Sequence, residues 1–83
     1  MSTTTALLDD ITAIFRELLD NENLVVTPEF SRDTHPEWDS MTHLNIIFAL
    51  EMKFGIKFGV ADVEAIRSVA DIIRLVQEKT RDR

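Results

Sequence analysis

Apolar side chains recur at helical spacing in several stretches of this chain, and polar stretches separate them. In residues 6–19, Leu8, Ile11, Phe15 and Leu18 return every three or four positions, which places them on one side of a helix. The sequence therefore predicts a first helix that buries this side.

Polar residues mark the expected start of this helix. Thr4 or Thr5 is predicted to cap it, because a hydroxyl oxygen there accepts a hydrogen bond from a free backbone N–H group. Asp9 and Asp10 are predicted to lie near its positive end, where acidic side chains are favourable.

Three more helices are predicted after a long connection. The first spans residues 40–54, with Asp39 as its N-cap and Gly55 ending it in a left-handed conformation. A short helix of two turns is predicted over residues 60–66, and a last helix over residues 69–79. Its start has the spacing of a capping box, formed by Ser68 and Asp71. Its buried stripe consists of Val69, Ile72, Ile73 and Val76.

The connection over residues 20–39 is longer than most links between helices. Its apolar residues predict that it packs against the helices as an ordered loop, with Leu24, Val25, Val26, Phe30 and Trp38 as anchors. One short helical turn is predicted near Pro28 to Phe30.

The helix over residues 40–54 has two apolar faces when each residue advances it by about 100°. The expected core face consists of Ile46, Ile47, Leu50 and Phe54, with Leu44 at its border. The nearly opposite face consists of Met41, Asn45, Phe48 and Met52. A surface helix needs only one apolar stripe, so we expect the second face to dock partners through Met41 and Phe48. For Met52, packing under the long loop is an equal alternative.

These elements predict an all-α fold. We expect a small antiparallel bundle of three main helices plus one short helix, with a long ordered loop between the first two helices. Residues 1–83 form a single domain, with an ordered part over about residues 6–79 and frayed ends at 1–5 and 80–83. Two glycines and two prolines in 83 residues argue against a turn-rich β fold.

Charge and composition limit the classes of function that the protein can have. The net charge of −6 disfavours nucleic acid as a partner. No apolar run is long enough to insert into a membrane, and no signal pattern precedes the first helix. The chain contains no cysteine, which excludes disulfides and thiol catalysis. We expect a cytoplasmic monomer.

Ser40 is the candidate chemical site. It stands where the loop ends and the 40–54 helix begins, so its hydroxyl is expected to be exposed at the positive end of that helix. A phosphate ester on Ser40 would be stabilised by backbone N–H groups and by the helix dipole.

The motifs along the chain resemble one family in order and spacing. Asp39-Ser40-Met41 is followed by Phe54-Gly55-Ile56 and then by Ser68-Val69-Ala70-Asp71. Together these segments resemble the second and last helices of acyl carrier proteins, and the resemblance covers about residues 6–79. In that family the serine at the position of Ser40 carries 4′-phosphopantetheine, transferred from coenzyme A by a phosphopantetheinyl transferase.

The resemblance implies a carrier that is not itself an enzyme. The thiol of the phosphopantetheine arm would hold an intermediate as a thioester and present it to loading and condensing enzymes, which supply the chemistry. Asp39 matches the acidic residue that helps the transferase place its metal ion and coenzyme A. Because the chain has no cysteine, a thioester needs an external thiol of this kind.

The chain departs from the family pattern at Glu37, where glycine is usual, and the helix over residues 40–54 is less acidic than in fatty-acid carriers. These departures resemble discrete carriers of specialised pathways, for polyketides, peptides or modified sugars and lipids. An aminoacyl or peptidyl carrier of a nonribosomal peptide pathway remains an alternative, as does an unmodified helical interaction domain. A serine hydrolase is disfavoured because Ser40 lacks triad partners.

The remaining polar residues are predicted to have minor roles. His35 and His43 lack metal-ligand spacing, and no metal site is predicted; His43 is expected to border the point where the arm leaves the surface. Asp62 and Glu64 are expected to be solvated. The basic residues expected to face helix C-termini or solvent are Arg67, Arg74 and Lys79.

Overall fold

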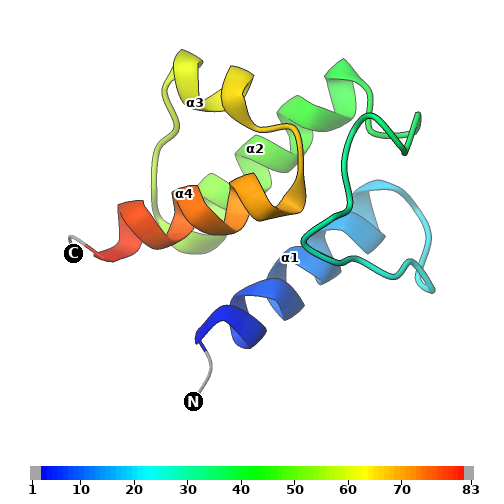
Figure 1. Cartoon of the computed structure of the whole chain (residues 1–83), viewed down its shortest axis with the longest axis horizontal. Coiled ribbons are helices and arrows are strands. Elements are labelled where there is room, and N and C mark those ends of the chain that lie inside the picture. Colours follow the sequence, from blue (N-terminus) through cyan, green and yellow to red (C-terminus); the bar gives the residue numbers. More distant parts are fainter. Residues whose placement is uncertain (1–2, 82–83) are drawn as a thin grey trace.

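The computed structural model describes residues 3–81, and all regular secondary structure in this range is helical. The elements are α1 (Thr3–Leu18), α2 (Ser40–Phe54), α3 (Val60–Ala65) and α4 (Val69–Arg81) (Figure 1). The predicted all-α fold of three main helices, one short helix and a long first loop is confirmed. Residues 3–5 and 80–81, predicted to fray, are helical; residues 1–2 and 82–83 lie outside the described range.

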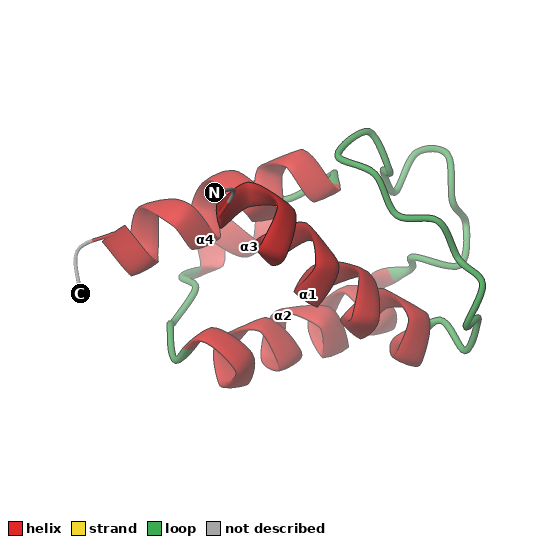
Figure 2. Cartoon of the chain, turned by 90° about the horizontal axis from the view of Figure 1, so that it is seen from below, coloured by secondary structure: helices red, strands yellow, loops and turns green. Residues whose placement is uncertain are grey.

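The helices form a bundle in which α1 packs against both α2 and α4. The chain runs along α1 toward the long loop and returns in the opposite direction along α2 (Figures 1 and 2). The loop gathers at one end of the bundle (Figure 2). Within residues 3–81, the helices lack the length and apolar content needed to cross a bilayer.

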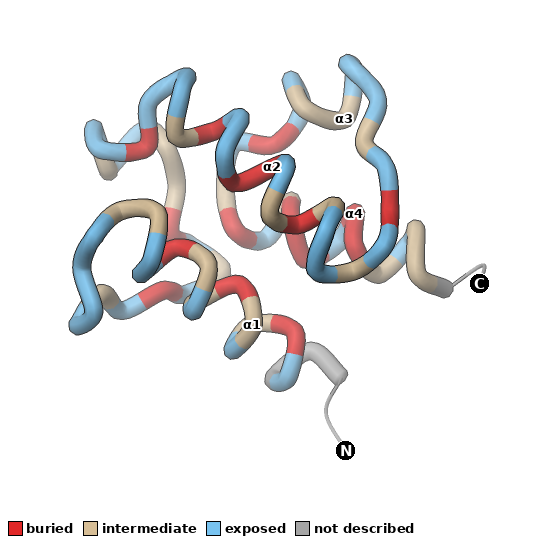
Figure 3. Tube along the Cα trace, turned by 180° about the vertical axis from the view of Figure 1, so that it is seen from behind, coloured by how far each residue is buried: buried red, intermediate tan, exposed pale blue. Residues whose placement is uncertain are grey.

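The hydrophobic core draws on all three main helices and on the loop, and Figure 3 marks the buried positions along the chain. On α2, Ile46, Ile47 and Leu50 are buried, and Phe54 packs against the core while partly exposed. The core face predicted for this helix is therefore confirmed. The other large apolar side chains that are almost fully enclosed are Ile11, Phe15, Trp38, Ile66, Val69, Ile72 and Val76.

The start of α1 differs from its prediction. The helix already begins at Thr3, so the backbones of Thr4 and Thr5 are inside it rather than in a capping position. Its first turn contains no acidic residue, so Asp9 and Asp10 lie beyond the positive end. Neither glycine nor proline interrupts residues 3–5, so the helix can extend over the threonines although their helix propensity is low.

The long loop is anchored by Val26, Phe30 and Trp38, which are buried as predicted. Val25 was also expected to be an anchor, but 72% of it is exposed. Consecutive residues in an extended segment point to opposite sides, so Val25 faces solvent when Val26 faces the core. The helical turn expected after Pro28 is a single hydrogen-bonded turn, closed by the bond from the Phe30 N–H to the Thr27 carbonyl.

The start of α4 confirms the predicted capping box. The Ser68 N–H donates to the Asp71 carboxylate over 3.2 Å, and the Asp71 N–H donates to the Ser68 hydroxyl oxygen over 3.4 Å. The loop adds two further caps, because the Pro28 and Phe30 carbonyls accept hydrogen bonds from the Ala70 and Val69 N–H groups over 3.0 and 2.9 Å.

Of the three basic side chains expected to face helix C-termini or solvent, Arg67 and Arg74 are exposed as predicted, whereas Lys79 is partly buried. All three also pair with carboxylates, which the prediction did not include. The pairs are Arg67 with Asp33 at 2.7 Å, Arg74 with Asp71 at 3.3 Å and Lys79 with Asp62 at 3.0 Å. Two of them join segments far apart in the sequence, which local spacing does not reveal. Exposed pairs contribute little to stability. The Arg67 pair connects the loop to the segment before α4, and the Lys79 pair connects α3 to α4.

Candidate functional site

The backbone turns into α2 at Asp39. This residue is extended, with φ −90° and ψ −173°, and its carboxylate accepts a hydrogen bond from the Thr42 N–H over 2.9 Å. The predicted N-cap is confirmed. The Thr42 N–H is the main reason why the pKa of Asp39 is lowered, since it stabilises the ionised carboxylate. A negative charge is thus fixed beside Ser40.

Ser40 is the first residue of α2 and is exposed. Its hydroxyl therefore lies at the positive end of a 15-residue helix that begins directly after the loop. A phosphate attached there meets the favourable end of the helix dipole and remains accessible to a partner enzyme.

His43 lies inside the protein, and the prediction that it borders the exit of the arm was wrong. Only 5% of it is exposed. Its Nδ1 accepts a hydrogen bond from the Trp38 indole N–H, and its Nε2 donates to the Val63 carbonyl, each over 2.9 Å. Both ring nitrogens are occupied, so His43 is not available as a base for Ser40.

The position of His43 follows from helix periodicity. Ile46 and Ile47, three and four residues later, lie on the same face of α2 and are buried. This register was the signal in the sequence that could have placed His43 on the core side. Burial lowers its pKa, while the hydrogen bond to the Val63 carbonyl acts in the opposite direction.

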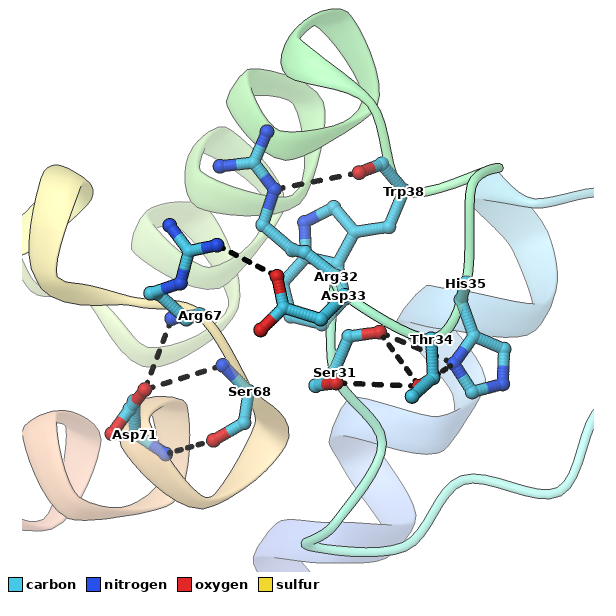
Figure 4. Close-up of polar contacts among 9 residues, drawn as sticks. All are labelled: Ser31, Arg32, Asp33, Thr34, His35, Trp38, Arg67, Ser68 and Asp71. Carbon is cyan, nitrogen blue, oxygen red and sulfur yellow. Dashed lines mark hydrogen bonds and ion pairs between the residues drawn. The ribbon is translucent and has the colours of Figure 1, made fainter.

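The segment before Ser40 is held by Trp38. Its ring meets the Phe15 ring edge-to-face, with centroids 5.0 Å apart. Its carbonyl accepts a hydrogen bond from Arg32 Nε over 3.4 Å (Figure 4). Beside it, Arg67 reaches Asp33 and ties the loop to the segment before α4 (Figure 4). The backbone directly before Ser40 is therefore held in place by Trp38.

The second face of α2 is exposed, as its periodicity predicted. The exposed fractions are 74% for Met41, 59% for Phe48 and 86% for Met52, so none of these packs under the long loop. Asn45 is also exposed. The sequence did not single out Val60, at the start of α3, which adds another apolar side chain that is 77% exposed.

Glu51 is the one acidic residue within α2. The Glu51 carboxylate accepts a hydrogen bond from the Phe58 N–H over 2.8 Å, which ties it to the segment after the helix. Asp39 directly precedes Ser40 as the N-cap, whereas Glu51 lies about three turns further along α2.

An apolar pocket lined by Leu7, Phe54 and Val76, among others, opens at the far end of the bundle. Phe54 is the last residue of α2, so about 20 Å of helix separates the pocket from Ser40. The pocket is not part of the site around Ser40.

Known proteins resemble this chain in both sequence and fold. The acyl carrier protein of Helicobacter pylori is 35% identical over 75 residues, which cover 88% of this chain and 94% of that protein. The acyl carrier protein of Chlamydia trachomatis serovar D is 33% identical over 76 residues, or 89% and 96% of the two chains. No protein-family model matches the chain.

A solved structure agrees with these relatives. The solution structure of a holo acyl carrier protein from Geobacter metallireducens superposes with a TM-score of 0.82 at 36% identity. The match covers 90% of this chain and 86% of that one.

The fold and these relatives define a helical carrier rather than an enzyme. The chain belongs to the acyl carrier protein family. It carries acyl intermediates on a 4′-phosphopantetheine arm. Its partners include a phosphopantetheinyl transferase and enzymes that act on acyl groups.

Proposed function

We propose that the phosphopantetheine arm is attached to Ser40. The observation that carries this proposal is the exposure of Ser40 at the start of α2, directly after the capping carboxylate of Asp39. The residues fit a phosphate ester, because the hydroxyl is accessible and the helix dipole favours negative charge there. The arm supplies the thiol that the sequence lacks.

We further propose a dedicated partner set in a specialised pathway. The exposed face of α2 presents Met41, Phe48 and Met52, while Glu51 is held by a backbone N–H. An apolar face of this kind suits partners that bind through apolar contacts more than through basic patches. The cargo is an acyl group, loaded and extended by acyl-loading and condensing enzymes. We place the protein in the cytoplasm as a single-domain monomer.

The direct test is to incubate the unmodified protein with coenzyme A and a broad-specificity phosphopantetheinyl transferase. Intact mass is expected to rise by one phosphopantetheine group, and fragment masses should place the group on Ser40. A protein that gains no mass with an active transferase would be an unmodified interaction domain. Modification at another serine would refute the assignment of Ser40.

Asp39 is expected to act both as the N-cap of α2 and as a charge recognised by the transferase. Asp39→Ala removes both functions and should lower the melting temperature and slow modification. Asp39→Ser keeps a good capping oxygen but removes the charge, so it should melt close to wild type and still be modified slowly. Equal modification rates for wild type and Asp39→Ser would reduce Asp39 to a cap alone.

The exposed face of α2 is expected to be the docking surface, with Met41 and Phe48 at its centre and Asn45 and Met52 at its edge. Replacing Met41 and Phe48 with glutamine should barely change the melting temperature, because both side chains are already exposed. Binding to the transferase should weaken by about 1–2 kcal/mol for each good anchor. Titration calorimetry would measure this loss, and Val25→Gln, exposed in the long loop, is the matched control.

A further inference from the structure

The imidazole of His43 joins three segments of the protein. It belongs to α2, accepts a hydrogen bond from Trp38 in the loop and donates one to the Val63 carbonyl in α3. The two partners are on opposite sides of the ring. His43 therefore links the residues directly before Ser40 to the short helix next to it.

The partners fix the protonation state of the ring. An indole N–H is a donor only and a backbone carbonyl is an acceptor only. Nδ1 must therefore be unprotonated and Nε2 must carry the hydrogen, which is one tautomer of the neutral ring. A proton on Nδ1 would face the Trp38 N–H as a second donor at 2.9 Å, so the present arrangement exists only with neutral His43.

The Trp38 indole has no acceptor for such a proton, and it cannot easily move away from it. It is 2% exposed, and its ring meets the rings of Phe15 and Phe30. His43 would have to turn instead, and the hydrogen bond to Val63 would then be lost.

α3 has few anchoring contacts within its own length, although the fully buried Ile66 follows it as the C-cap. None of its six residues is buried, and a helix this short is not stable alone. Besides the partial packing of Val63, it is held by the hydrogen bond from His43 and by the ion pair between Asp62 and Lys79 at 3.0 Å.

We propose that His43 is a positioning residue for the modification of Ser40: when neutral, it fixes Trp38 and α3 around the start of α2, and its protonation releases them. The proposal rests on the proposed function, because it takes Ser40 as the modified residue. Its consequence is that the surface offered to the transferase is complete only while the ring is neutral.

The charged groups on the surrounding elements do not favour protonation of the His43 ring. Arg32 in the loop disfavours a positive charge on His43. The Asp39 carboxylate is bound to the Thr42 N–H, and the Asp62 carboxylate to the Gly59 N–H and to Lys79. Glu64 of α3 is exposed. Because the pKa of His43 is lowered in the fold, its contribution to stability is present at neutral pH and is lost as the pH falls below about 6.5.

The test compares wild type, His43→Gln, His43→Phe and the control His35→Gln between pH 5 and 8. Glutamine has one acceptor and one donor flanking a single carbon, as Nδ1 and Nε2 do, and does not titrate. Transfer rates from coenzyme A are expressed relative to His43→Gln at each pH, which removes the pH profile of the transferase. The indole N–H signal of Trp38, the single tryptophan, and amide exchange of residues 60–65 report the structure directly.

The expected result is that His43→Gln remains close to wild type at pH 8, whereas His43→Phe is slower and has a higher KM. Below the midpoint of His43, the relative rate of wild type should fall with the neutral fraction, approaching about tenfold per pH unit. The indole signal and α3 exchange should change with the same midpoint in wild type and His35→Gln, and not in His43→Gln.

If the transfer rates of wild type and His43→Gln depended on pH in the same way, the proposal would be overturned. It would also be overturned if amide exchange in α3 did not change as His43 titrates. If α3 loosens on acidification while the relative rate stays constant, His43 holds the fold but does not position Ser40. If wild type is never modified at Ser40, the proposed function fails, and the indole and exchange measurements still decide whether His43 holds α3.

Discussion

Replacing Ser40 with alanine is expected to abolish attachment of the phosphopantetheine arm and leave the fold intact. The substitution removes the one oxygen through which the proposed ester forms. Ser40 is exposed at the first position of α2, so the free energy of unfolding should change by only about 0.5 kcal/mol. Intact mass after incubation with coenzyme A and transferase measures the first effect, and thermal unfolding measures the second.

Ser31→Ala is the matched control, since it deletes a partly buried hydroxyl in the long loop. This variant should gain the arm as wild type does. A Ser40→Ala protein that still gains mass would show that another residue is modified. A Ser40→Ala protein that unfolds would show that Ser40 is structural.

Leu50→Ala is expected to cause one of the largest losses of stability, about 2–5 kcal/mol. Leu50 is fully enclosed on the core face of α2, and truncation leaves a cavity that the surrounding helices cannot fill. Ile47→Ala should behave similarly, since it is 3% exposed. A domain of 83 residues has a total stability of about 4–12 kcal/mol, so either change removes a large part of it.

Urea unfolding followed by the fluorescence of Trp38 would measure these losses. Met52→Ala is the control on the same helix, because its side chain is 86% exposed and its removal should cost little. If Leu50→Ala and Met52→Ala unfolded at the same urea concentration, the assignment of the core face of α2 would be wrong.

The sequence was sufficient to predict the structural features that depend on residues close together along the chain. The two faces of α2, its N-cap at Asp39 and its left-handed end at Gly55, with φ 65°, all follow from local spacing and residue type. The capping box of Ser68 and Asp71 was predictable for the same reason. Ser40 was predicted to be the attachment site because a motif and a helix start coincide.

Features that depend on distant segments were missed. The pairing of Arg67 with Asp33 requires the loop to fold back beside α4, and no local pattern encodes that distance. His43 was predicted to border the exit of the arm because it lies one turn after Ser40, although its register matched the core face. The buried indole and a backbone carbonyl satisfy its nitrogens, and neither contact is visible in sequence spacing.

The backbone contacts between the long loop and α4 have a consequence for how the domain opens. The Pro28 and Phe30 carbonyls bind the first two N–H groups of α4, and Arg32 donates its N–H to the Arg67 carbonyl. Release of the loop would therefore leave the Val69 and Ala70 N–H groups without these partners, with only the Ser68–Asp71 capping box remaining. The two segments should thus open as one cooperative unit rather than as independent ones. A stretch of chain without a helix of its own thereby shares the local stability of the last helix.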